Sequence, residues 1–184
     1  MSVRSKWLFI FLGNDASGKT TIQKSLVELL AGAQYQRLPS NNTYSITHDY
    51  LLRKFRKVFV AGRSYQELRE PRGDYTTVEE YFRKLDSAGA DVDLAFMASH
   101  LDLADIEMMV EQGHRRFWNV CGIFLSNSIA WQTQANADIS DRLWWDERWL
   151  AENTPAEDEQ MQADQLRRVA TTILQMLTEC TRGW

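Results

Sequence analysis

Cysteine is scarce in this sequence. Only two cysteines occur in 184 residues, Cys121 and Cys180, and no Cys-x-x-Cys pair is present. Small disulfide-stabilised domains are rich in cysteine, and structural zinc sites use closely spaced pairs. The sequence therefore predicts neither a disulfide framework nor a zinc site. A reducing compartment suits such a chain, so we expect a cytoplasmic protein.

Long apolar runs and an excess of basic charge are also lacking. No run approaches the roughly 20 apolar residues that a membrane-spanning helix needs. The apolar stretch after Arg4 and Lys6 is too short for a signal peptide. A net charge of −4 argues against a protein that coats nucleic acid. We expect one soluble domain over residues 1–184, with no membrane partner and with nucleic acid as a disfavoured one.

A glycine-rich stretch, Gly13–Thr20, fits the phosphate-loop pattern G-x-x-x-x-G-K-[ST] at every fixed position. It follows the apolar run Trp7–Leu12, which is typical of a buried strand, and precedes an amphipathic helix at about 18–30. In this arrangement backbone N–H groups and the positive end of the helix dipole surround a phosphate. We expect these residues to bind a nucleotide: Gly13, Asn14, Asp15, Ala16, Ser17, Gly18, Lys19, Thr20 and Thr21.

Two side chains of this loop have distinct predicted roles. Lys19 would reach the β- and γ-phosphates as a catalytic cation, and the Thr20 hydroxyl would ligate a metal ion. The expected cofactors are therefore ATP and Mg²⁺.

Apolar periodicity along the chain alternates between strands and helices. Strands are predicted at 6–12, 92–98 and 117–125, and helices at 18–30, 48–61, 77–87, 102–113 and 154–180. Another strand is expected either at 35–38 or at 43–47. This alternation predicts an α/β fold with a mainly parallel central sheet and right-handed crossovers.

A basic segment, residues 53–72, lies within this otherwise acidic chain. It holds seven arginine or lysine residues and two glutamates, so seven minus two gives a net charge of +5. Such a run is either a solvated helix face or a cradle for an anionic acceptor. In the second interpretation Arg53 and Arg56 bind the acceptor, and residues 41–88 form an acceptor-binding insertion.

The strand at 92–98 ends where a ligand is expected, because open parallel sheets bind ligands beyond the C-terminal ends of their strands. A carboxylate often accompanies a phosphate loop there, but Ser99 and His100 follow instead, and Asp93 lies near the opposite end. We expect Ser99 to contact substrate. His100 either orients an acceptor or water near the γ-phosphate, or caps the next helix. Thr20, phosphate oxygens and waters then suffice for Mg²⁺.

Three further residues are catalytic candidates. Asp49 either accepts a proton from a substrate hydroxyl or caps a helix. Arg142 and Arg148 lie in a tryptophan-rich segment, 128–153, which we interpret as a lid carrying a transition-state clamp. Their six-residue spacing puts them on different faces of one helix, so at most one is expected to act. The tryptophans are expected mainly in the core.

The loop resembles those of small P-loop kinases, and the thymidylate-kinase-like pattern G-x-D-x-[SA]-G-K-T-T is the nearest match. Asp15 and the double threonine, Thr20 and Thr21, are the shared details. The resemblance is strong over residues 7–30 and topological beyond. It implies a kinase-like three-layer sandwich, an ATP·Mg donor, an acceptor region after the second strand and an arginine-bearing lid. Thymidylate kinases carry an Asp-Arg pair where this chain has Ser99-His100, so the resemblance indicates a class and not an acceptor.

The sequence therefore predicts a phosphotransferase that moves the γ-phosphate of ATP to a small, anionic acceptor, such as a nucleotide, nucleoside or phosphorylated metabolite. The alternative is a nucleotide-dependent regulatory or binding ATPase that acts through a macromolecular partner. It is motivated by the missing strand-end carboxylate and the abundant tryptophan. A weaker alternative uses the basic segment to hold nucleic acid.

Overall fold

A six-stranded sheet forms the centre of the protein. The computed structural model describes residues 5–69, 73, 75–126, 133–154 and 158–181. The strand order is β2-β3-β4-β1-β5-β6, and every neighbouring pair is parallel except β2 with β3. The strands are β1 (Trp7–Leu12), β2 (Asn42–Ser45), β3 (Lys57–Ser64), β4 (Val92–Ser99), β5 (Asn119–Leu125) and β6 (Glu147–Ala151). The predicted α/β class and mainly parallel sheet are confirmed.

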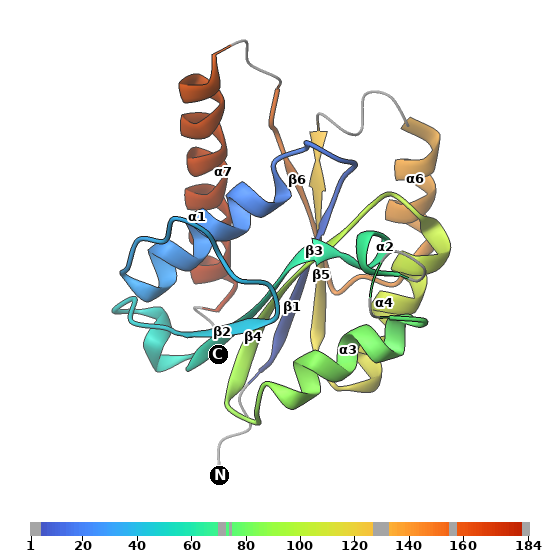
Figure 1. Ribbon diagram of the computed structural model, residues 1–184, viewed down its shortest axis with the longest axis horizontal. Coiled ribbons are helices and arrows are strands. Elements are labelled where there is room, and N and C mark those ends of the chain that lie inside the picture. Colours follow the sequence, from blue (N-terminus) through green and yellow to red (C-terminus); the bar gives the residue numbers. More distant parts are fainter. Residues whose placement is uncertain (1–4, 70–72, 74, 127–132, 155–157, 182–184) are drawn as a thin grey trace.

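Helices cover both faces of the sheet and make three layers (Figure 1). On one face lie α1 (Lys19–Ala31) and α7 (Glu159–Cys180). On the other lie α2 (Tyr65–Leu68), α3 (Val78–Ser87), α4 (Leu103–Arg115) and α6 (Thr133–Arg142). The sheet therefore separates two apolar cores.

The central strand, β1, is buried on both faces. Trp7, Phe9 and Phe11 point into the core under α1 and α7, whereas Leu8, Ile10 and Leu12 point into the other core. This period of two is what a central parallel strand requires. The strand ends immediately before Gly13, so it delivers the glycine-rich loop to the C-terminal edge of the sheet.

The helix predicted over residues 48–61 is wrong. Only a short 3-10 turn, Leu51–Arg53, forms there, and the chain from Lys57 onward is strand β3. Val58 points into one core and Phe59 into the other, so the segment is buried with the period of a strand. The neighbouring edge strand, β2, overlaps the second of the two expected positions.

One predicted helix start is confirmed and another changes. The capping box at Thr77 is present, because its hydroxyl accepts from Glu80 N and the Glu80 carboxylate accepts from Thr77 N. The last helix, however, is capped by Asp158 rather than beginning at Thr154. The interval before it holds a strand that the sequence did not predict, β6, which pairs with β5.

The tryptophan-rich segment is therefore part of the sandwich over much of its length. Trp145 and Trp149 are buried in the two cores, as expected, while Trp144 is 81% exposed. Residues 128–132 of the proposed lid lie outside the described residues. Arg142 ends helix α6 and Arg148 lies in strand β6, so the two arginines are not on one helix.

Candidate functional site

The loop between β1 and α1 has a left-handed backbone at Gly18, one of its two fixed glycines, and also at Ala16, but not at Gly13. Gly13 N donates to Ser99 O at 3.1 Å, so the loop leaves the sheet beside the end of β4. Ala16 and Gly18 have φ of 59° and 89°, in the left-handed region. A Cβ on Gly18 would lie 2.7 Å from Leu166 of α7. The left-handed backbone therefore favours glycine at residue 18, and a larger residue there would also require the Leu166 side chain to move.

Lys19 begins helix α1 and turns its side chain back over the loop. It is only 7% exposed, and its ammonium donates to the carbonyls of Gly13 and, at 2.7 Å, Asn14. Burial lowers the pKa of Lys19, while the nearby carboxylates of Glu67 and Asp15 act in the opposite direction. The loop thus holds a buried ammonium at the C-terminal edge of the sheet.

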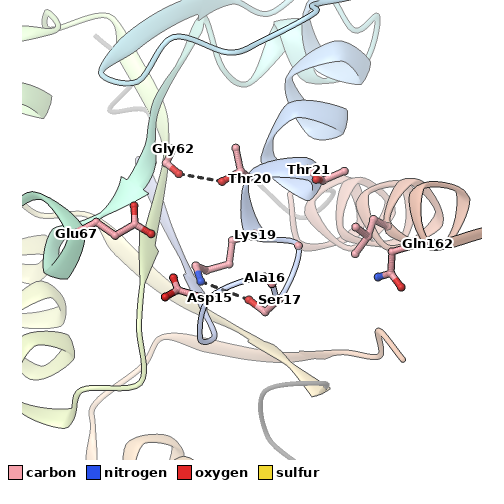
Figure 2. Close-up of a pocket in the computed structure, with 11 residues that line it drawn as sticks. Asp15, Ala16, Ser17, Lys19, Thr20, Thr21, Gly62, Glu67 and Gln162 are labelled. Carbon is pink, nitrogen blue, oxygen red and sulfur yellow. Dashed lines mark hydrogen bonds between the residues drawn. The ribbon is translucent and has the colours of Figure 1, made fainter. Parts of the chain in front are cut away.

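A cleft of about 450 Å³ opens over this ammonium (Figure 2). The Thr20 hydroxyl donates to the carbonyl of Gly62, at 3.1 Å, which ties the first turn of α1 to β3. The oxygen of that hydroxyl keeps acceptor capacity. The residues lining the cleft are Asp15, Ala16, Ser17, Gly18, Lys19, Thr20, Thr21, Gly62, Glu67, Gln162 and Leu166.

Three titratable side chains meet beside the cleft. His100 Nε2 lies 3.0 Å from Asp15 Oδ1 and 3.4 Å from Glu67 Oε1. They come from three different elements: the loop after β1, helix α2 and the end of β4. Their ligand atoms all lie within 4.8 Å of one another, and these donor types bind divalent cations. The sequence predicted Asp15 and His100 for the site but missed Glu67.

The side chain of Gln66 links α2 to the end of β4 and to α4. Its Oε1 accepts from His100 N at 3.1 Å, and its Nε2 donates to Ser99 Oγ and to Asp105 Oδ2 at 3.1 and 3.0 Å. Ser99 is fully buried, and its hydroxyl donates to the carbonyl of His100. The Ser99 hydroxyl therefore fastens α2 to β4, and Ser99 is not among the residues that line the cleft, so its expected contact with substrate stays a prediction.

Asp49, Arg53 and Arg56 lie at the other end of the sheet from the loop. His48 N donates to the carbonyl of Leu30, in the last turn of α1. Since α1 has 13 residues, that turn is about 20 Å from the loop. Arg56 pairs with Asp93 near the start of β4. These three predicted residues therefore lie apart from the candidate site, and their predicted roles stay untested, because β2 runs antiparallel to β3 and the connection between them lies at this end of the sheet.

The two predicted clamp arginines are engaged elsewhere. Arg142 Nη2 lies 3.3 Å from Oδ1 of Asp138, which is on the same helix. Arg148 donates to the Ser140 carbonyl at 2.6 Å and to Asp141 at 3.3 Å. In the part of the chain that the structure describes, neither arginine lines a cleft at the loop.

A second cleft, of about 660 Å³, adjoins the first. The two clefts share Thr20, Gly62 and Glu67 in their linings. Two arginines, Arg37 and Arg63, also line it, and Arg63 Nε lies 3.7 Å from Glu67 Oε2. Its remaining lining residues are Leu38, Pro39 and Ser40. A molecule in the second cleft would therefore contact three of the residues that line the cleft over Lys19.

No protein-family model matches this chain, and no significant match was found among curated proteins or solved structures. Within the described residues, none of the helices has both the length and the apolar character needed to cross a membrane.

Proposed function

We propose that this protein is a phosphotransferase that moves the γ-phosphate of ATP, bound as ATP·Mg²⁺, to a small anionic acceptor. The observation that carries the proposal is the buried Lys19 ammonium, which lies in a loop of phosphate-loop sequence and lines a cleft of about 450 Å³. An adjoining second cleft is lined by Arg37 and Arg63. Such chemistry depends on positioning and charge neutralisation more than on covalent catalysis.

The donor binds through the loop. Lys19 exchanges its contacts with the carbonyls of Gly13 and Asn14 for phosphate oxygens, while backbone N–H groups hold the other phosphates. Thr20 fits the metal, because its hydroxyl hydrogen is directed to the Gly62 carbonyl and its lone pairs remain available as ligands. The Mg²⁺, when bound, neutralises charge on the phosphates.

The acceptor binds in the second cleft. Arg37 and Arg63 neutralise its anionic group, since guanidinium groups match carboxylate and phosphate oxygens in geometry. Glu67 lines both clefts and is the carboxylate suited to accept the proton of an acceptor hydroxyl. This assignment gives Glu67 the role that the sequence suggested for Asp49.

The proposal is tested with γ-labelled ATP and a panel of nucleosides, nucleoside monophosphates and phosphorylated sugars. Wild-type protein should label at least one acceptor. Lys19→Ala should lower the turnover number at least about 100-fold, because it removes a cation from the transferring phosphate. Lys24→Ala is the matched control: Lys24 lies on the same helix but pairs with Glu28 outside the cleft. Equal turnover of the Lys19 and Lys24 variants would contradict the proposal.

A regulatory ATPase is the second candidate, and the exposed Trp144 is the observation that favours it, as a contact for a partner protein. In that case ATP hydrolysis would proceed without stimulation by any small acceptor. The nucleic-acid alternative has less support, because Arg56 and Lys57 of the basic segment pair with Asp93 and Asp91. Arg72, at the end of that segment, lies outside the described residues.

A further inference from the structure

The fully buried side-chain amide of Asn153 ties the glycine-rich loop to the segment that follows the edge strand β6. Asn153 follows strand β6 and has no exposed surface. Its side-chain Nδ2 donates to the carbonyl of Ser17 at 2.7 Å, across 136 positions of sequence. Ser17 is itself buried. A hydrogen bond between two buried groups is costly to lose, because neither can turn to water instead.

Ser126 fixes the orientation of that amide. Asn153 N donates to Ser126 Oγ at 2.8 Å, and the same hydroxyl donates to Asn153 Oδ1 at 3.4 Å. The amide oxygen is thus occupied by a donor, which leaves Nδ2 to face the Ser17 carbonyl. Ser126 directly follows β5 and Asn153 closely follows β6, so the ends of two neighbouring strands hold the loop in place.

The bond acts on the peptide unit between Ser17 and Gly18. In a planar trans peptide the C=O and N–H point in opposite directions. Holding the Ser17 carbonyl toward Asn153 therefore turns the Gly18 N–H away from Asn153. Gly18 lines the cleft over Lys19, where an N–H is a donor for a phosphate.

We propose that Asn153 is a positioning residue for the phosphate-binding loop: it fixes the Ser17–Gly18 peptide so that the Gly18 N–H is presented to a bound nucleoside triphosphate. This inference rests on the proposed binding of ATP at the loop. It adds a residue from the C-terminal part of the chain, which the loop motif does not contain.

The test measures the dissociation constant of a fluorescent, methylanthraniloyl-labelled ATP with the full chain in the presence of Mg²⁺. Asn153→Ala should weaken binding by about ten-fold, the scale of one lost buried hydrogen bond. Asp93→Asn is the control, because it perturbs a buried polar group at the opposite end of the sheet. It should lower the melting temperature and leave the dissociation constant within two-fold.

Asn153→Asp provides a readout that a purely structural role would not give. The ionised carboxylate offers no donor to the Ser17 carbonyl, whereas the protonated acid does. The ratio of its dissociation constant to that of wild type should therefore fall as the pH is lowered from 8 to 5.5. The corresponding ratio for Asn153→Ala should stay constant.

Ser126→Ala covers the case in which the Asn153 variants do not fold. It removes only the hydroxyl that orients the amide, and it should weaken binding by about two- to five-fold. Folded Asn153→Ala or Ser126→Ala protein that binds the labelled ATP like wild type would overturn the inference and leave ATP binding intact. Wild-type protein that fails to bind the nucleotide would overturn both.

Discussion

The Arg56 guanidinium holds the buried carboxylate of Asp93 through two parallel hydrogen bonds. Nε lies 2.9 Å from Oδ2 and Nη2 lies 2.9 Å from Oδ1. The backbone N–H of Arg56 donates to Oδ2 as well, at 2.8 Å. These bonds raise the pKa of Arg56. They fasten the chain before β3 to the start of β4, at the edge of the sheet away from the loop.

The first prediction concerns this pair. Asp93→Ala should lower the free energy of unfolding by about 2–4 kcal/mol, because it removes three hydrogen bonds to a buried charge. Urea denaturation measures the loss. The comparison variant is Asp91→Ala, whose carboxylate pairs with Lys57 at the surface and should matter far less. ATP affinity should be unchanged in both, and a large drop in either would show that this end of the sheet reaches the site.

The strand β1, its loop and helix α1 could be predicted from the sequence because their signals are local. The buried strand, the glycines and Lys19 follow one another within about 20 residues, so no distant contact decides their structure. The helix α3 was predictable for the same reason, since Thr77 and Glu80 complete a capping box within one turn.

Glu67 and the second cleft could not be predicted, because they depend on strand β3, whose sequence has a helix-like pattern. Leu51, Phe55, Val58 and Phe59 fall at helical spacing, yet Val58 and Phe59 point to opposite cores once β3 lies between β2 and β4. Tertiary pairing overrode the local pattern. With β3 assigned as a helix, the strand-end rule had no strand with which to find Glu67.

The second prediction concerns Gly18 and Leu166. Gly18→Ala places a methyl group 2.7 Å from Leu166 Cδ2 in a left-handed backbone, and should weaken ATP binding by about ten-fold or more. Leu166→Ala in that background relieves the contact but not the backbone strain. A double-mutant cycle on unfolding should therefore show coupling of about 0.5–3 kcal/mol, while ATP affinity stays low. Full recovery of affinity in the double variant would mean that the contact alone matters.

The third prediction concerns Asp105, a buried residue in the first turn of α4. Burial raises the pKa of Asp105, and the neighbouring Asp102 carboxylate adds to this effect. A carboxyl group whose pKa is raised by folding stabilises the protein below its unfolded pKa of 3.8, and this contribution is lost as pH rises through the folded value. The free energy of unfolding of Asp105→Asn, taken relative to that of wild type, should therefore rise as the pH is raised from 4 to 7.

Glu80 gives the matched experiment of opposite sign. Hydrogen bonds from Thr76 lower the pKa of Glu80, so its carboxylate stabilises the fold above pH 4.5 and this contribution is lost as pH falls. Glu80→Gln should be less stable than wild type at pH 7, and the difference should shrink on acidification. Urea denaturation at pH 4 and 7 measures both variants. Parallel pH responses of the two would contradict the assignment.

The fourth prediction concerns the two arginines of the second cleft. Arg37→Ala and Arg63→Ala should each raise KM for the acceptor by about ten-fold, since each removes one charge-assisted contact. KM for ATP should change little, because neither arginine lines the cleft over Lys19. Arg83, on the exposed side of α3, pairs with Glu79 and serves as the control. Steady-state kinetics with the acceptor found in the screen provide the measurement.

The last prediction separates two roles for Glu67. As a proton acceptor it contributes about 10²- to 10⁴-fold to turnover, so Glu67→Gln should lower kcat by that factor. The amide keeps the shape of the side chain, and ATP affinity should stay within a few-fold of wild type. Glu79→Gln is the control, because that carboxylate lies on the exposed side of α3.

The alternative role of Glu67 is to balance the positive charge of Lys19. Glu67 Oε1 lies 3.4 Å from His100 Nε2, and the Glu67 carboxylate is close enough to the Lys19 ammonium to act on its pKa. Loss of that balance would change the binding of ATP and of the acceptor and leave kcat nearly intact. A fall in kcat at saturating concentrations of both substrates therefore assigns proton transfer, because uniform binding effects disappear under those conditions.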